Sequence, residues 1–285
     1  MSSRQRAMAT QNEEIADRGE YRSPAGAVVR IAEELAEARA GTVSYPADAE
    51  FGAGPGPVRV PGAVAGAGVG AVADAEVEVT GEGSMQAARR LVADGGRSVA
   101  VLNFASARNP GGGYLRGAKA QEEDVCRSSL LYRCLLEAPD YYEAHRASTD
   151  LRYSHRVIWS PGVPVIRDDR GELLERTHRV GFLTSPAPNA GQLALRSPGR
   201  PLGLGPLLAE RAGRVLAAAA RHGARELVLG AWGCGVFRND PAEVADAFGR
   251  ALDEWGAAFD RVVFAVWDRS VPSANRTAFE ERFGR

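Results

Sequence analysis

The sequence predicts an α/β fold in which helices cover both faces of a mostly parallel sheet. Segments of strand type and helix type alternate over about 200 residues, which is typical of such a sheet. One segment, 98–105 (SVAVLNFA), is an uninterrupted apolar run of the kind found in strands buried on both faces. A chain of 285 residues, 45% of them hydrophobic, is long enough to bury a full core.

The expected elements are assigned from hydrophobic spacing and from Gly and Pro boundaries. Asp240, Pro241 and Glu243 mark a helix start, because a capping Asp, a proline at the first position and a Glu three residues after the cap each favour one. Strands are expected over 75–79, 98–105, 157–159, 163–166, 180–183, 226–230 and 261–266. Helices are expected over 13–16, 28–39, 84–93, 121–137, 207–221 and 273–282, and from Asp240 onward.

Residues 51–73 form a segment rich in glycine, proline and alanine. Glycine and proline at this density do not sustain a helix or a central strand, so we expect a surface loop insertion. A dinucleotide-binding motif at Gly66, Gly68 and Gly70 is disfavoured because no strand precedes it. The expected division is an N-terminal helical extension (1–50), the insertion (51–73) and a catalytic domain (74–285).

Composition excludes several classes of protein. The 35 basic and 36 acidic residues give a net charge of −1, which argues against a general nucleic-acid coat. Three scattered cysteines do not form a disulfide framework or a CxxC zinc site. No apolar run reaches the roughly 18–20 residues of a membrane span, and the N-terminus lacks a signal-peptide core. We therefore expect a soluble, cytoplasmic protein with no membrane partner.

A glycine turn and two carboxylates follow the apolar strand. The strand ends near Asn103, Gly111–Gly113 form the turn, and Gln121, Glu122 and Glu123 begin a helix. Glycines at the carboxyl end of such a strand let backbone N–H groups approach a ligand. Three glycines alone are an ordinary turn; the strand before them and the carboxylates after them favour a ligand site.

A second glycine-rich loop lies between the strand at 226–230 and the helix capped by Asp240. Gly230, Gly233 and Gly235 lie in the sequence GAWGCGVFRND. Successive backbone N–H groups in such a loop form a nest that holds a diphosphate without lysine. Taken by itself, a tight connection between strand and helix explains this loop equally well.

The two loops together resemble a known family. Gly111–Gly113, seven further residues and then Gln121-Glu122-Glu123 resemble the signature of poly(ADP-ribose) glycohydrolases. The flanking NFAS, NPGGGY and RSSLLY and the downstream GCGVFRNDP resemble the bacterial type of that family. The resemblance covers residues 85–285 well and the N-terminal helices loosely. It implies a three-layer α/β/α macrodomain with a mixed, mostly parallel central sheet and an N-terminal helical extension.

The resemblance also implies an activity and a role for each matching residue. The substrate would be poly(ADP-ribose), including chains on ADP-ribosylated proteins, cut at the ribose–ribose O-glycosidic bond to release ADP-ribose. Glu123 would be the general acid and then the base, Glu122 would hold a ribose hydroxyl, and Gln121 would support the loop. Gly111, Gly112 and Gly113 would wrap the terminal ribose and phosphate, and Asn103 would contact a ribose. The diphosphate loop would consist of Gly233, Cys234, Gly235 and Val236, and Phe237 would pack on the distal ribose.

The chemistry of glycoside cleavage agrees with a carboxylic acid beside the leaving oxygen. Two neighbours in sequence, Glu122 and Glu123, are not expected to face each other across a bond, so one acid would serve both steps. An acid that is protonated near pH 7 needs a raised pKa, which burial and a like charge both supply. No cofactor, no metal and no direct DNA or RNA binding are implied, so activity should survive EDTA.

Two other functions stay open at this point. One is a non-catalytic ADP-ribose reader on the same fold, and the other is a hydrolase of mono-ADP-ribosylated protein or of small ADP-ribose esters. The adjacent glutamates favour an enzyme over a reader.

Several prominent residues are not assigned to the site. The four histidines lack metal-ligand spacing, so each is expected at the surface or satisfied by hydrogen bonds. Trp232 and Trp267 are expected in the core, with adenine stacking as the alternative. Four arginines are expected on a solvated face: Arg152, Arg156, Arg167 and Arg170.

Overall fold

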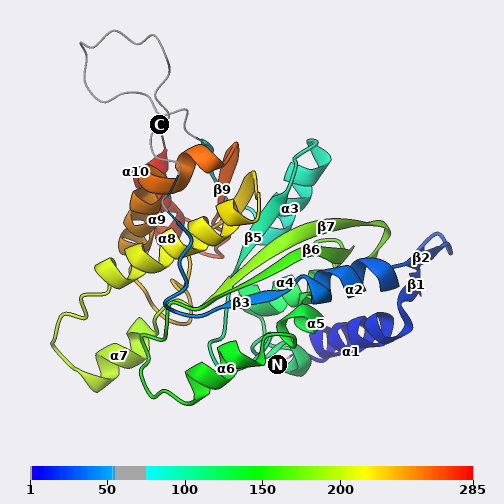
Figure 1. The fold of residues 1–285 in the computed structure, drawn as a ribbon, viewed down its shortest axis with the longest axis horizontal. Coiled ribbons are helices and arrows are strands. Elements are labelled where there is room, and N and C mark those ends of the chain that lie inside the picture. Colours follow the sequence, from blue (N-terminus) through cyan, green and yellow to red (C-terminus); the bar gives the residue numbers. More distant parts are fainter. Residues whose placement is uncertain (1, 53, 55–74, 285) are drawn as a thin grey trace, which may run out of the picture.

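A mixed sheet with helices on both faces forms the centre of the molecule (Figure 1). The computed structural model describes residues 2–52, 54 and 75–284. In this part of the chain the sheet has seven strands in the order β3-β6-β7-β5-β8-β9-β4. The pairs from β7 to β4 are parallel, and β6 runs antiparallel to both of its neighbours. The predicted three-layer, mostly parallel α/β/α architecture is confirmed.

The strands of this sheet are β3 (Val43–Tyr45), β4 (Glu76–Thr80), β5 (Val99–Phe104), β6 (Val157–Arg167), β7 (Leu173–Ser185), β8 (Glu226–Leu229) and β9 (Arg261–Ala265). A separate hairpin joins β1 (Glu20–Arg22) to β2 (Val28–Arg30). The α-helices are α1 (Ser3–Arg18), α2 (Ala32–Ala40), α3 (Ser84–Ala93), α4 (Gln121–Ser128), α5 (Leu131–Leu135), α6 (Pro139–Arg146), α7 (Ala190–Arg196), α8 (Gly205–Arg221), α9 (Pro241–Trp255) and α10 (Ala274–Phe283). Short 3-10 turns are η1 (Tyr114–Arg116) and η2 (Gly256–Ala258).

Strand β5 shows why its sequence is an uninterrupted apolar run. Val99 and Val101 face one hydrophobic core, and Ala100 and Leu102 face another. The first core lies under helices from α1 to α6, and the second lies under α8, α9 and α10. Because successive side chains point to opposite faces, a strand covered on both faces needs apolar residues at every position.

Three expectations about local structure are wrong, each because of tertiary pairing. Residues 28–30 are strand β2 and not helix, since they pair with β1. The helix expected over 121–137 stops at Ser129, where the chain bridges to Val165 and the N–H of Leu130 donates to the Pro164 carbonyl oxygen. The strands expected at 157–159 and 163–166 are one strand, β6, with a bulge between Ser160 and Val163.

The N-terminal 50 residues contain more than helices. Besides α1 and α2, they supply the hairpin and β3, which extends the main sheet beside β6. The expected insertion over 51–73, including Gly66, Gly68 and Gly70, lies almost entirely outside the described residues. The division into three segments stays a prediction. In the described ranges, none of the helices has the length and apolar composition that crossing a membrane requires.

Candidate active site

Two loops leave the same edge of the sheet from neighbouring parallel strands. Residues 105–120 follow β5, and residues 230–240 follow β8. The β5–β8 pairing ends at Val101 and Val228, and beyond it Gly230 packs closely against the Phe104 ring, which lies 3.2 Å from the position of a Cβ built on Gly230. Ligands of open α/β sheets bind at such an edge.

Gln121 fastens the start of α4 to the end of β5. Its Oε1 accepts a hydrogen bond from the backbone N–H of Phe104 at 2.8 Å, and its Nε2 donates to the carbonyl oxygen of Leu102 at 2.8 Å and to Ser84 at 3.1 Å. The side-chain amide of Gln121 therefore makes the hydrogen bonds to β5 that a neighbouring strand would otherwise make there. This contact fixes where the next two side chains lie.

Glu122 is buried beneath the first loop. Its Oε2 accepts a hydrogen bond from the backbone N–H of Ser106 at 2.7 Å, and its Oε1 accepts from Nδ2 of Asn103 at 3.3 Å. Burial, reinforced by the neighbouring charge of Glu123, raises the pKa of Glu122 to about 8 against the hydrogen bonds that lower it. The side chain is therefore mostly protonated at neutral pH.

Glu123 is held by backbone donors on both oxygens. Its Oε1 accepts from the N–H of Gly113 at 2.8 Å, and its Oε2 accepts from the N–H of Ala120 at 2.7 Å. The second bond is half of a capping box, because Ala120 has no side-chain oxygen to return it. The exposed fraction of Glu123 is only 7%. The carboxylate is thus fixed against the glycine turn and does not point into solvent.

Gly112 is the point on which both carboxylates converge. A Cβ built on Gly112 would lie 2.5 Å from Oε1 of Glu123 and 2.9 Å from Oε2 of Glu122. Its φ of +57° is also in the region that favours glycine. The two acids therefore lie together under one loop, as their adjacency in sequence predicts, and do not flank a bond from opposite sides.

The second loop presents backbone donors. Among the hydrogen bonds of the described residues, none is donated by the consecutive N–H groups of Gly235, Val236 and Phe237. The base of the loop is tied by Asn239, whose Nδ2 donates to the carbonyl oxygens of Pro188 and Gly233. Free, successive N–H groups on a fixed base match an anion-binding nest.

Comparisons with known proteins identify the family of the chain. The family model described as the microbial-type PARG catalytic domain matches residues 9–168. The chain belongs to the microbial-type poly(ADP-ribose) glycohydrolase (PARG) family. The crystal structure of PARG from Thermomonospora curvata has a TM-score of 0.87 and 45% identity, and the match covers 99% of this chain and 100% of that chain.

Two further structures of microbial PARGs carry ligands. PARG from Thermomonospora curvata bound to the inhibitor ADP-HPD matches with a TM-score of 0.86 and 45% identity, over 99% of this chain and 100% of that chain. PARG from Deinococcus radiodurans in complex with ADP-ribose matches with a TM-score of 0.76 and 41% identity, over 90% of this chain and 99% of that chain. A search of curated proteins found no match.

The remaining predicted PARG site residues differ in exposure. Asn103 is fully buried behind Glu122 and also donates to Thr184, so its contact with a ribose stays a prediction. In the second loop Val236 is 81% exposed, whereas Cys234 and Phe237 are half-buried. Phe237 contacts the ring of Tyr153, with 6.1 Å between ring centroids.

Sequence reasoning missed one residue that shapes the candidate site. Ser106 donates its backbone N–H to Glu122, and its Oγ accepts from the N–H of Asn109 at 3.1 Å. The signal was present, because a serine three residues before Asn-Pro-Gly is typical of a hydroxyl-capped turn.

Two residues left outside the site were placed wrongly. Trp267 is 60% exposed, unlike Trp232, which is buried as expected. Trp267 lies two residues after the end of β9, just beyond the buried side chain of Val266. Arg167 is buried and not on a solvated face, because Nε donates to Asn12 and NH1 to the Gly171 carbonyl oxygen.

The histidines do not form a metal site in the described ranges, where no group of three or more His, Cys, Asp and Glu is arranged to hold an ion. His145 is buried and hydrogen-bonded to Tyr141 and Ser154.

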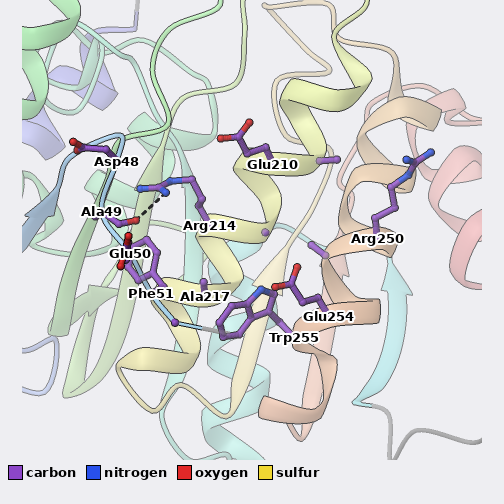
Figure 2. Close-up of a pocket in the computed structure, with 14 residues that line it drawn as sticks. Asp48, Ala49, Glu50, Phe51, Glu210, Arg214, Ala217, Arg250, Glu254 and Trp255 are labelled. Atoms are coloured by element: carbon purple, nitrogen blue, oxygen red, sulfur yellow. Dashed lines mark hydrogen bonds between the residues drawn. The ribbon is translucent and has the colours of Figure 1, made fainter. Parts of the chain in front are cut away.

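A cavity of about 710 Å³ lies away from these loops, between residues 48–52 and helices α8 and α9 (Figure 2). Figure 2 shows Arg214 reaching toward Ala49, whose carbonyl oxygen accepts from it at 3.0 Å. The lining includes four carboxylates and two guanidinium groups: Asp48, Glu50, Glu210, Glu254, Arg214 and Arg250. An excess of carboxylates disfavours a diphosphate in this cavity, so the two loops remain the candidate site.

Proposed function

We propose that the chain hydrolyses the ribose–ribose O-glycosidic bonds of poly(ADP-ribose) and releases ADP-ribose. The observation that carries this proposal is the convergence of two buried carboxylates on Gly112, at the sheet edge where the neighbouring loop presents three consecutive N–H groups that donate to no acceptor among the described residues. A reader of ADP-ribose needs the N–H groups and not the acids. Membership of the PARG family, and the ligands in the related structures, support the same substrate.

In this proposal Glu123 is the general acid and then the general base. It donates a proton to the departing ribose oxygen as the glycosidic C–O bond breaks, and the ionised carboxylate then takes a proton from the water that attacks the anomeric carbon. The two backbone donors from Gly113 and Ala120 hold its orientation in both steps. Glu123 is therefore protonated again after each bond is cleaved.

Glu122 would hold a ribose hydroxyl in this scheme. Because the pKa of Glu122 is raised to about 8, the neutral side chain can donate a hydrogen bond to the sugar at pH 7. A neutral Glu122 also avoids a second negative charge beside Glu123 when the latter ionises. Asn103 and Ser106 fix the Glu122 carboxyl from behind.

The second loop would hold the diphosphate. The N–H groups of Gly235, Val236 and Phe237 would donate to its oxygens, and the half-buried Phe237 ring would pack on the distal ribose. The bound anion would then lie near the positive charge that develops on the sugar in an oxocarbenium-like transition state. Gly233, at φ +72°, gives the loop its turn.

The partners follow from this substrate. We propose that the chain acts in the cytoplasm on poly(ADP-ribose) carried by modified proteins, without binding DNA, RNA or membrane itself. A near-neutral net charge supports the exclusion of nucleic acid.

The test is the substitution Glu123→Gln, with Glu33→Gln on the exposed face of α2 as the matched control. Release of ADP-ribose from poly(ADP-ribose) should fall by about 10²–10⁴-fold in Glu123→Gln, because the acid and base are lost. Binding of ADP-ribose, measured by calorimetry, should stay within about threefold, and Glu33→Gln should match the wild type. Near-normal turnover by Glu123→Gln would refute the role of Glu123.

A parallel assay on singly modified protein separates the other enzyme. Wild-type release from poly(ADP-ribose) and not from mono-ADP-ribosylated protein supports the glycohydrolase. Release from the latter alone points to the mono-ADP-ribose hydrolase, and release from neither points to a reader.

A further inference from the structure

Phe237 lies in the second loop, where its half-buried ring packs at the edge of the hydrophobic core under α8 and α9 and has few backbone contacts around it. The N–H groups of residues 235–237 have no acceptor among the described residues, and the adjacent Val236 is 81% exposed. The carbonyl oxygen of Phe237 accepts a hydrogen bond from Gly191 at 2.9 Å, which fixes the backbone and not the ring. The position of the ring therefore depends on what packs against it.

The ring of Tyr153 packs against the ring of Phe237. The two ring centroids lie 6.1 Å apart at an interplanar angle of 41°, within the range of favourable aromatic pairs. Tyr153 is half-buried and has a φ of +59°, a conformation that a bulky residue adopts only when its surroundings enforce it.

Arg211 of α8 holds the backbone of Tyr153 in this conformation. Its NH2 donates to the carbonyl oxygens of Arg152 at 2.9 Å and Tyr153 at 3.2 Å, and its NH1 donates to that of Pro186 at 2.7 Å. The side chain is fully buried. A buried cation that donates to three carbonyl oxygens ties the turn at 150–154 to the loop after β7.

His145 of α6 holds the other side of the turn. Its Nε2 accepts from the backbone N–H of Ser154 at 3.2 Å, so its Nδ1 carries the proton and donates to the Tyr141 carbonyl oxygen at 2.8 Å. The His145 ring meets the edge of Tyr153, with centroids 5.9 Å apart. Tyr153 is thus fixed from two helices.

We propose that Tyr153 is a positioning residue for the cleavage reaction, whose ring sets the angle at which Phe237 meets the distal ribose. This inference rests on the proposed function. Tyr153 touches no substrate in this scheme and acts only through Phe237. Its contribution should therefore appear in turnover more than in substrate affinity, since small errors in the position of the reacting sugar reduce the rate of chemistry.

The test is a double-mutant cycle of Tyr153→Ala and Phe237→Ala, with kcat and KM measured on poly(ADP-ribose). We expect Tyr153→Ala to lower kcat about tenfold or more, with KM within about threefold. Tyr153→Phe should keep the wild-type kcat, because the ring and not the hydroxyl makes the contact. In the Phe237→Ala background, Tyr153→Ala should lower kcat by less than about twofold, since residues that act through one contact are not additive.

Controls separate this role from a loss of folding. Tyr45→Ala removes another half-buried ring, on β3 away from the loops, and should leave kcat unchanged. If Tyr153→Ala does not fold, Tyr153→Leu keeps most of the apolar volume and supplies the same cycle.

The outcomes distinguish this inference from the proposed function. An unchanged kcat in Tyr153→Ala, or an equal loss with and without Phe237, overturns the role of Tyr153 alone. A wild-type chain that releases no ADP-ribose from the polymer overturns the proposed function and this inference together.

Discussion

Glu122 and Glu123 are neighbours in sequence with different surroundings. Glu122 is enclosed behind the loop with Asn103, and burial raises its pKa to about 8. Glu123 lies against the glycine turn, where two backbone N–H groups orient it. Pairs of carboxyl groups placed in unlike environments commonly take unlike roles in catalysis. Here the enclosed acid suits holding a hydroxyl, and the oriented one suits proton transfer.

The raised pKa of Glu122 predicts a pH dependence of stability. An unfolded glutamate has a pKa of about 4.3, so between about pH 5 and pH 8 the folded chain holds a proton that the unfolded chain has released. Wild-type stability therefore decreases through this window relative to Glu122→Gln, which has no carboxyl group there. We expect the difference in the free energy of unfolding, measured with urea, to change by roughly 2–4 kcal/mol. A difference that is constant from pH 5 to pH 8 would contradict the burial argument.

Gly112→Ala tests the close approach of both carboxylates to the turn. Its Cβ would lie 2.5 Å from Glu123, in addition to the strain of a positive φ. Gly95→Ala is the matched control, because Gly95 has a φ of +84° with nothing within 4 Å of its Cβ position. Both should lose about 1 kcal/mol or more of stability from backbone strain. Only Gly112→Ala should also lose activity, by more than about tenfold in ADP-ribose release. Equal activity in the two variants would count against the assigned site.

At the scale of residues, the sequence predicts that the glycine turn and the two acids lie together, because they are close along the chain. Their roles in a site stay predictions. Sequence reasoning fails for Arg167, whose partner Asn12 lies on a helix far away in sequence. It fails also for Tyr153, since no local pattern shows that its ring meets Phe237.

At the scale of elements, α1 supports the helix that carries the acids. Nδ2 of Asn12 donates to the carbonyl oxygen of Arg127 at 2.8 Å, in the last turn of α4, and Oδ1 accepts from Arg167 at 2.8 Å. The Tyr114 hydroxyl, next to the glycine turn, donates to Glu13 of the same helix. The N-terminal helix is therefore part of the framework of the site.

Asn12→Ala should reveal this support. It leaves a buried guanidinium N–H and a helix-end carbonyl without their partner, so we expect a loss of about 2 kcal/mol in the free energy of unfolding. Thr10→Ala on the exposed face of α1 should change stability by less than about 0.5 kcal/mol. Urea titration of the two variants makes the comparison. A similar, small effect of both substitutions would show that α1 is only loosely attached.

Elements with clear local signals were predicted closely. The helix at 84–93 is α3 (Ser84–Ala93), and α9 begins after the Asp240 cap, whose side chain accepts from Ala242 and Glu243. The errors lie where pairing with distant residues determines the local structure. At Ser129, for example, the chain leaves the helix and forms a bridge with Val165. Strand β3 has only three residues, too few for a periodicity to emerge.

At the scale of the whole molecule, the fold brings two loops that are more than a hundred residues apart to one sheet edge. The alternation of strands and helices predicts the parallel sheet, but the order of its strands does not follow from that alternation. That β5 and β8 are neighbours, and that their loops therefore meet, is information that the structure adds.

The central claim is that Glu123 and the N–H groups of residues 235–237 act on one nucleotide. The most direct measurement is a crystal structure of Glu123→Gln soaked with ADP-ribose. We predict diphosphate oxygens within hydrogen-bond distance of the N–H groups of Gly235, Val236 and Phe237, and the distal ribose beside the residue 123 side chain. A nucleotide bound elsewhere, for example in the cavity between α8 and α9, or a side chain at 123 turned away from the ribose, would contradict it.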